Sequence, residues 1–119
     1  MPTIDQFVND IDNTLTRRGY LIMSLGCEVL EDNSKIFFNS AIDADTEEYI
    51  EYSFLATHLL GTVVNFSWVR FQNPHGEQTS SERAVSLDVS TKLNLPTTPE
   101  KAADIFEEAF RTLGISPKK

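Results

Sequence analysis

The chain has 119 residues, of which 40% are hydrophobic and 24% are charged, and its formal net charge is −8. This size and composition are typical of one globular domain with its own core, so we expect a single domain over 1–119 with a flexible tail at 116–119. The negative charge disfavours binding to nucleic acid or to an anionic membrane surface, because both interactions need a basic protein surface.

The first predicted element is an amphipathic helix over about 4–18. Its apolar residues recur with helical spacing and form one stripe. Thr3 and Gln6 have the spacing of a capping box, and Gly19 can take the left-handed position after the last turn. The stripe consists of Ile4, Phe7, Val8, Ile11 and Leu15.

Two strands are predicted next, over 21–30 and 35–44, joined by the polar turn 31–34 into a β-hairpin. In the first strand, every second residue from Leu21 to Val29 shares one face. Cys27 belongs to this set, so we expect a buried structural thiol rather than a nucleophile.

The segment 46–60 fits both a helix and a strand. The helical interpretation has Asp45 or Thr46 as the N-cap and Gly61 as the stop signal, and it is the one we favour. The strand interpretation places alternate residues of good β propensity on one side, from Ile50 to Ala56. It would also put two leucines into the following turn, which counts against it.

The last three elements are two strands and a helix. The strand 62–72 is apolar on both faces, which is typical of a central strand, whereas 84–95 alternates between apolar and polar residues, as in a sheet with one solvated face. A polar loop at 73–81 separates them. The final helix starts at Thr98 as N-cap with Pro99 at its first position, and it ends at Gly114.

The elements together predict an α+β fold with the order α-β-β-(α or β)-β-β-α. We expect a mostly antiparallel sheet of four or five strands, with the N-terminal and C-terminal amphipathic helices packed on one face.

Charge is distributed unevenly along the chain. Residues 28–51 contain eight acids and one base, which is nearly all of the excess negative charge. We expect the acids at the end of this segment to form one exposed negative surface that binds a basic protein partner. These candidate partner-binding residues are Asp43, Asp45, Glu47, Glu48 and Glu51.

Patterns that carry chemistry are missing from the sequence. No serine lies in a nucleophile elbow, the five glycines are isolated, and the cysteine and histidines lack the paired spacing of a zinc site. Asp43, Asp45 and Glu47 fit the first positions of a calcium loop, but Glu48 replaces its required glycine and Phe54 its required glutamate. We therefore expect no catalytic residues, no resident metal and no cofactor.

The function expected from these patterns is that of a small acidic, non-catalytic protein-binding module, such as an immunity protein, another inhibitor or a secretion chaperone. An exposed apolar strip would favour the chaperone, and a purely acidic surface would favour the inhibitor. The alternative is a small-ligand or calcium-binding protein that uses the 43–51 acids. A homodimer through an apolar sheet face is compatible with either.

We expect a cytoplasmic location. The N-terminal residues lack the basic and apolar regions of a signal peptide, and a single cysteine allows no internal disulfide. The longest uncharged stretch, 52–69, contains several polar residues and makes a poor membrane span.

Overall fold

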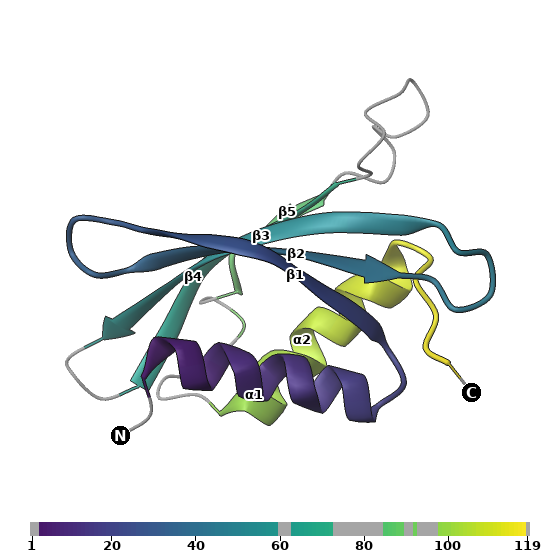
Figure 1. The fold of residues 1–119 in the computed structure, drawn as a ribbon, viewed down its shortest axis with the longest axis horizontal. Coiled ribbons are helices and arrows are strands. Elements are labelled where there is room, and N and C mark those ends of the chain that lie inside the picture. Colours follow the sequence, from purple (N-terminus) through teal and green to yellow (C-terminus); the bar gives the residue numbers. More distant parts are fainter. Residues whose placement is uncertain (1–2, 60–62, 73–84, 90–91, 93–97, 119) are drawn as a thin grey trace.

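The computed structural model describes residues 3–59, 63–72, 85–89, 92 and 98–118. The described residues form two helices and five strands, and the strands make one antiparallel meander in the order β1-β2-β3-β4-β5. Both helices lie on the same side of the sheet, which leaves its other face open (Figure 1). The predicted α+β fold is confirmed. The elements are α1 (Ile4–Arg17), β1 (Leu21–Val29), β2 (Lys35–Ile42), β3 (Tyr49–Leu59), β4 (Val63–Gln72), β5 (Val85–Leu87) and α2 (Pro99–Thr112).

Both helices begin where the capping residues predict. In α1, Thr3 Oγ1 accepts a hydrogen bond from the Gln6 N–H at 3.1 Å, and Gln6 Oε1 accepts one from the Thr3 N–H at 3.0 Å. In α2, Thr98 Oγ1 accepts from the Lys101 N–H at 3.3 Å, with Pro99 at the first helical position. These bonds satisfy N–H groups that the helices leave without an intrahelical partner. Neither described helix is long and apolar enough to cross a bilayer.

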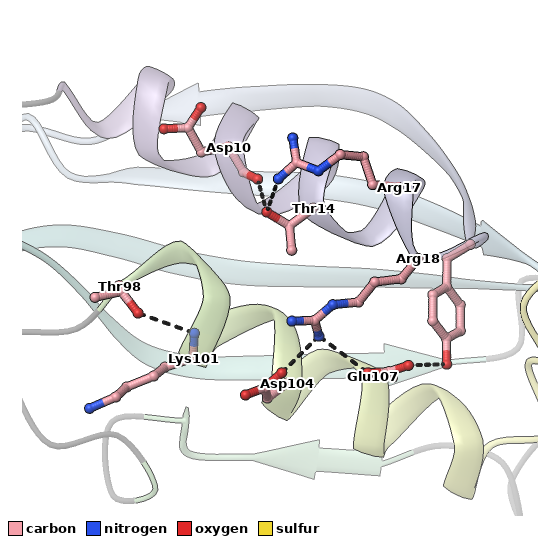
Figure 2. A network of polar contacts seen from close by, with 9 residues as sticks. Asp10, Thr14, Arg17, Arg18, Thr98, Lys101, Asp104 and Glu107 are labelled. Atoms are coloured by element: carbon pink, nitrogen blue, oxygen red, sulfur yellow. Dashed lines mark hydrogen bonds and ion pairs between the residues drawn. The ribbon is translucent and has the colours of Figure 1, made fainter.

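The two helices are joined at their surface by a charged contact. Arg18 Nη1 lies 2.7 Å from Asp104 Oδ1 and 3.2 Å from Glu107 Oε1. Figure 2 shows Arg18 reaching from the end of α1 to these two residues of α2. The Tyr20 hydroxyl donates to the other oxygen of Glu107 at 3.0 Å, and burial of this hydroxyl raises its pKa to about 12. Because the ion pairs are partly solvated, they contribute little to the free energy of unfolding.

The core between helices and sheet is largely aromatic. The Phe54 ring lies 5.3 Å from the Phe66 ring and 5.4 Å from the Phe106 ring, measured between centroids. The Tyr52 ring lies 5.4 Å from the Phe110 ring. All five side chains are buried, so strands β3 and β4 are held to α2 by ring packing.

The helix favoured for 46–60 is wrong, because the structure has the strand β3 there. Its alternate residues from Ile50 to Ala56 are buried against the helices, while the residues between them are only half buried. Strand β3 is hydrogen-bonded to β2 on one side and to β4 on the other. Pairing on both sides, which local patterns do not show, decides in favour of the strand. Gly61, expected to end the helix, lies outside the described residues.

Two strands were predicted after β3. The first, over 62–72, is confirmed as β4, and the second, over 84–95, is shorter in the structure. Strand β4 lies between β3 and β5, which agrees with its central position. The strand expected over 84–95 is wrong at the described residues beyond Leu87, which are 88, 89 and 92, because β5 ends at Leu87. Val89 leaves the strand and is nevertheless fully buried in the core. The expected loop 73–81 and residues 90–91 and 93–97 lie outside the described residues.

The segment after α2 contacts two distant parts of the chain. The Ser116 N–H donates to Asp43 Oδ1 at 2.6 Å, and the Lys118 N–H donates to the Gly19 carbonyl at 2.7 Å. Gly19 has a φ of +99°, and an added Cβ there would lie 2.5 Å from the Lys118 carbonyl oxygen. A side chain at position 19 would therefore displace the C-terminal segment.

Candidate binding surface

Large exposed apolar side chains gather at one edge of the sheet. Among the described residues they all lie on β1 or on its neighbour β2, with 38–59% of their surface exposed. Isolated exposed apolar residues are ordinary, but a contiguous group is typical of a binding surface. Four of them share the open face of the sheet and are called the apolar strip: Leu21, Met23, Leu25 and Phe38.

A β-bulge decides which β1 residues reach this open face. The pairing shifts between Ser24 and Gly26, so Leu25 is the extra residue. Beyond the bulge, Cys27 pairs with Phe37, which is buried on the helix-covered face. Paired residues of an antiparallel sheet share a face, so Cys27 is on the opposite side from the apolar strip.

Two expectations for β1 are therefore wrong. Its alternate residues do not share one face, because the bulge moves Cys27 and Val29 to the other side of the sheet. Cys27 is also exposed rather than buried, since it lies on the edge strand. An isolated Gly26 in a strand is the sequence signal of a bulge, and its φ of +132° is one that other residues rarely adopt.

An open groove of about 240 Å³ lies beside the apolar strip. Leu25 and Phe38 line one side, while Glu51, Ser53 and Arg70 from β3 and β4 line the other. The carboxylate and the guanidinium do not form an ion pair with each other within the described part of the chain. The groove therefore offers a partner apolar contact together with one negative and one positive group.

Asp43 does not belong to an exposed acidic surface, which corrects the expectation for this residue. Its side chain is only 3% exposed. Asp43 Oδ2 accepts from Thr46 Oγ1 at 2.7 Å and from the Thr46 N–H at 2.8 Å, while Oδ1 accepts from the Ser116 N–H. The hydrogen bonds from Thr46 and from Ser116 lower the pKa of Asp43 from 3.8 to about 2. This carboxylate fixes the turn and the C-terminal segment together.

The other candidate acids lie in two places. Asp45, Glu47 and Glu48 are exposed on the turn between β2 and β3, and we call this group the acidic turn. Glu47 has a φ of +65°, and its N–H donates to the Asp43 carbonyl at 3.0 Å. Glu51 lies instead on β3, in the groove. The structure thus places three acids at one end of the strip and one beside it.

A polar cluster lies between α1 and the sheet, with Asn39 and Tyr52 buried and Asp12 partly buried, and no sequence pattern predicted it. Asn39 Nδ2 donates to Asp12 Oδ1 and to the Tyr52 hydroxyl oxygen, both at 3.2 Å. Burial raises the pKa of Asp12 from 3.8 to about 6, although the hydrogen bond from Asn39 opposes the rise. Burial also raises the pKa of Tyr52. The three groups satisfy one another between the helix and the sheet, so we assign the cluster to the fold.

The sequence patterns identify neither the apolar strip nor Arg70 as part of a binding surface. Within the described ranges, no group of three or more histidine, cysteine, aspartate or glutamate side chains could hold a metal ion. The calcium alternative remains a prediction without a described ligand set.

Comparison with protein-family models, with curated proteins and with solved structures gave no match.

Proposed function

We propose that this protein is a non-catalytic protein-binding module of the chaperone kind, and that it binds its partner through the apolar strip and the adjoining groove. The observation that supports this proposal is the gathering of the exposed large apolar side chains along β1 and β2. A purely acidic surface would have favoured an inhibitor instead.

The composition of this surface supports binding. Burying exposed apolar area on association is favourable by roughly 25 cal/mol per Å². Met23 is adaptable in shape, and Phe38 offers a large rigid ring, both of which are enriched at the centres of interfaces. Glu51 and Arg70 lie at the margin of the strip, where charged groups select the partner more than they tighten the complex.

The acidic turn supports a basic partner. It adjoins the strip, because Leu21 pairs with Ile42 at the end of β2 that leads into the turn. Exposed like charges at the border of an apolar surface raise the rate at which oppositely charged partners associate. Salt weakens such steering, because charges in solution are screened over about 10 Å at 0.1 M ionic strength.

The test is capture of partners from a lysate of the source cells, with two variants compared. Met23→Ser combined with Phe38→Ser removes the strip, and Asn9→Ser combined with Asn13→Ser is the matched control on the exposed face of α1. We expect one stoichiometric basic protein that the control retains and the strip variant loses by about tenfold or more. Retention of the same protein by both variants would place binding elsewhere.

A second measurement separates a chaperone from an inhibitor. Limited proteolysis of the captured partner reports whether the bound part is extended or folded. Rapid cleavage on either side of a short protected segment is expected for chaperone-like binding. A partner that stays compact and protease-resistant throughout would favour the inhibitor.

A further inference from the structure

Among the strands that the structure describes, none lies beside the outer edge of β1. In sheet order β1 is terminal, and within the described part of the chain its strand neighbour is β2 alone. The opposite edge is β5, which has 3 residues, whereas β1 has 9. Proteins protect an edge by keeping it short, by placing lysine or proline on it, or by a β-bulge. β5 is short, whereas β1 is long and has no lysine or proline, and its one bulge at Leu25 leaves regularly paired strand on both sides.

The main-chain groups that face outward can be assigned beyond the bulge. The Leu30 N–H donates to the Ser34 carbonyl at 2.8 Å, so this end of β1 begins with a hydrogen-bonded pair. Hydrogen-bonded and non-hydrogen-bonded pairs alternate along an antiparallel ladder. The N–H and C=O groups of Val29 and Cys27 therefore point away from β2.

The same alternation applies before the bulge. The Asp43 N–H donates to the Glu48 carbonyl on the β3 side at 2.7 Å. Ala41, two residues earlier, therefore also bonds to β3. Its β1 partner Ile22 thus points its main chain outward, and Ser24 does the same two residues later. Four outward-facing amides along one strand form a template for another strand.

Charge along this edge follows a simple pattern. The stretch from Leu21 to Cys27 is uncharged. The acidic turn lies at one end, beside the pair of Leu21 with Ile42, and Glu28, Glu31 and Asp32 lie at the other. At about 3.3 Å per residue, the apolar stretch between the two acidic ends is roughly 20–25 Å long.

We infer that β1 accepts an extended segment of the partner as a sixth strand of the sheet, with apolar residues at alternate positions and basic residues at both ends. This inference rests on the proposed function and names the partner's binding segment. Main-chain hydrogen bonds from the outward amides hold the segment, while its apolar side chains extend the apolar strip on the open face. Its basic ends meet the acids that flank β1.

A second copy of this chain fits the edge less well. If two β1 strands paired in antiparallel fashion, the acidic turn of each copy would lie beside Glu28, Glu31 and Asp32 of the other. Like charges facing each other across a pair of strands are destabilising. The formal net charge of −8 on each copy adds repulsion over a longer range.

The probe is a synthetic peptide of about nine residues, with valine and threonine alternating in the middle and arginines at both ends. One control peptide replaces the arginines by glutamates. Two further peptides are N-methylated at alternate amides. In each peptide the methyl groups lie along one edge of the strand and block pairing there, and the two peptides are methylated on opposite edges. Affinity is measured by fluorescence anisotropy, and protection of the Ile22, Ser24, Cys27 and Val29 amides by hydrogen exchange.

We expect the arginine peptide to bind and to protect these four amides. The glutamate peptide should bind at least about tenfold more weakly, and only one of the two N-methylated peptides should lose binding. Val29→Pro removes an outward N–H without disturbing the ladder to β2, so it should weaken the peptide while Val29→Ala does not. The melting temperatures of the two variants should be alike.

The outcomes separate this inference from the proposed function. If both N-methylated peptides still bind and binding is lost in the Met23→Ser and Phe38→Ser variant, the partner docks by side chains on the open face. The inference then fails and the proposed function stands. Concentration-dependent protection of the β1 amides without peptide would show that a second copy occupies the edge, which also overturns the inference. If the arginine peptide does not bind at all and no captured partner depends on the strip, both fail.

Discussion

The two faces of the sheet differ although the same strands build both. Phe37 and Phe38 are neighbours on β2 and point to opposite faces, where 8% and 38% of their surface is exposed. Phe37 stacks on Phe54 under the helices at 5.4 Å, whereas Phe38 lines the open groove. Burial on one face is sufficient to define the core, so apolar residues on the other face point to a role outside folding.

The largest loss of stability should come from truncating a side chain on the covered face. Phe54→Ala removes a fully buried ring that contacts several other rings, so we expect a loss of about 3–5 kcal/mol in the free energy of unfolding. Phe38→Ala on the open face should cost about 1 kcal/mol or less, because its ring is already partly solvated. Urea unfolding of both variants measures the difference. Equal losses would mean that the open face also belongs to the core.

Two carboxylates, Asp12 on the covered face and Asp43 in the turn after β2, also have different surroundings. Asp12 is enclosed between α1 and the covered face and shares the amide of Asn39. Asp43 lies in the turn and accepts hydrogen bonds from Thr46 and Ser116. Burial dominates for Asp12, and hydrogen bonding to the charged form dominates for Asp43. Their pKa values therefore move in opposite directions from 3.8, to about 6 and to about 2.

The substitution Asp12→Asn should raise the free energy of unfolding at neutral pH. The pKa of Asp12 is raised in the folded state, so its ionisation costs stability as pH rises from 3.8 through 6. At about 1.4 kcal/mol per pKa unit, the cost at pH 7 is about 3 kcal/mol. The variant keeps an oxygen that accepts from Asn39 and should be more stable than the parent at pH 7, but not at pH 4. Urea midpoints across this range test it, and parallel profiles for the two proteins would show that Asp12 is not the titrating group.

The substitution Asp43→Asn should instead lower the free energy of unfolding at neutral pH. The carboxylate accepts from three donors, and the amide would direct a donor at one of them, so we expect a loss of about 1.5–3 kcal/mol at pH 7. The pKa of Asp43 is depressed, so its contribution is present above pH 3.8 and is lost as pH falls through about 2. Thermal unfolding from pH 7 to pH 2 should therefore show the parent and the variant converging in acid. A constant difference over this range would contradict the assignment.

Elements governed by local chemistry were predictable from the sequence, and so were the β1–β2 hairpin and the central position of β4, whereas the strand β3 and the division of β1 between two faces depend on pairing and were not predicted. The capping box at Thr3 and the start of α2 at Thr98 follow from neighbouring residues. Residues 49–59 became a strand because β2 and β4 lie on either side, and this information is absent from the segment itself. The apolar alternation of β1 continues through the bulge, so only the isolated Gly26 indicates that the strand is divided between two faces.

The candidate site was predicted only in part for a similar reason. Sequence position groups Asp43 with Asp45, but the bond from Ser116, 73 residues away, makes Asp43 a structural residue. Exposure of the apolar strip depends on which strand lies at the edge and which face the helices cover. Both are properties of the assembled sheet, so no local pattern reports them.

The smallest effect on stability should come from the acidic turn. Asp45 and Glu47 are exposed, and no described hydrogen bond uses their side chains, so Asp45→Asn combined with Glu47→Gln should change the free energy of unfolding by about 0.5 kcal/mol or less. Glu47 keeps its left-handed backbone in this variant, since glutamine has the same branching at Cβ. Binding of a basic partner should nevertheless weaken several-fold at low salt, and the difference should shrink as salt is added. Unfolding curves and anisotropy titrations at two ionic strengths measure both effects. Loss of fold would show that the acids on this turn are structural like Asp43, and unchanged binding at low salt would restrict recognition to the apolar strip.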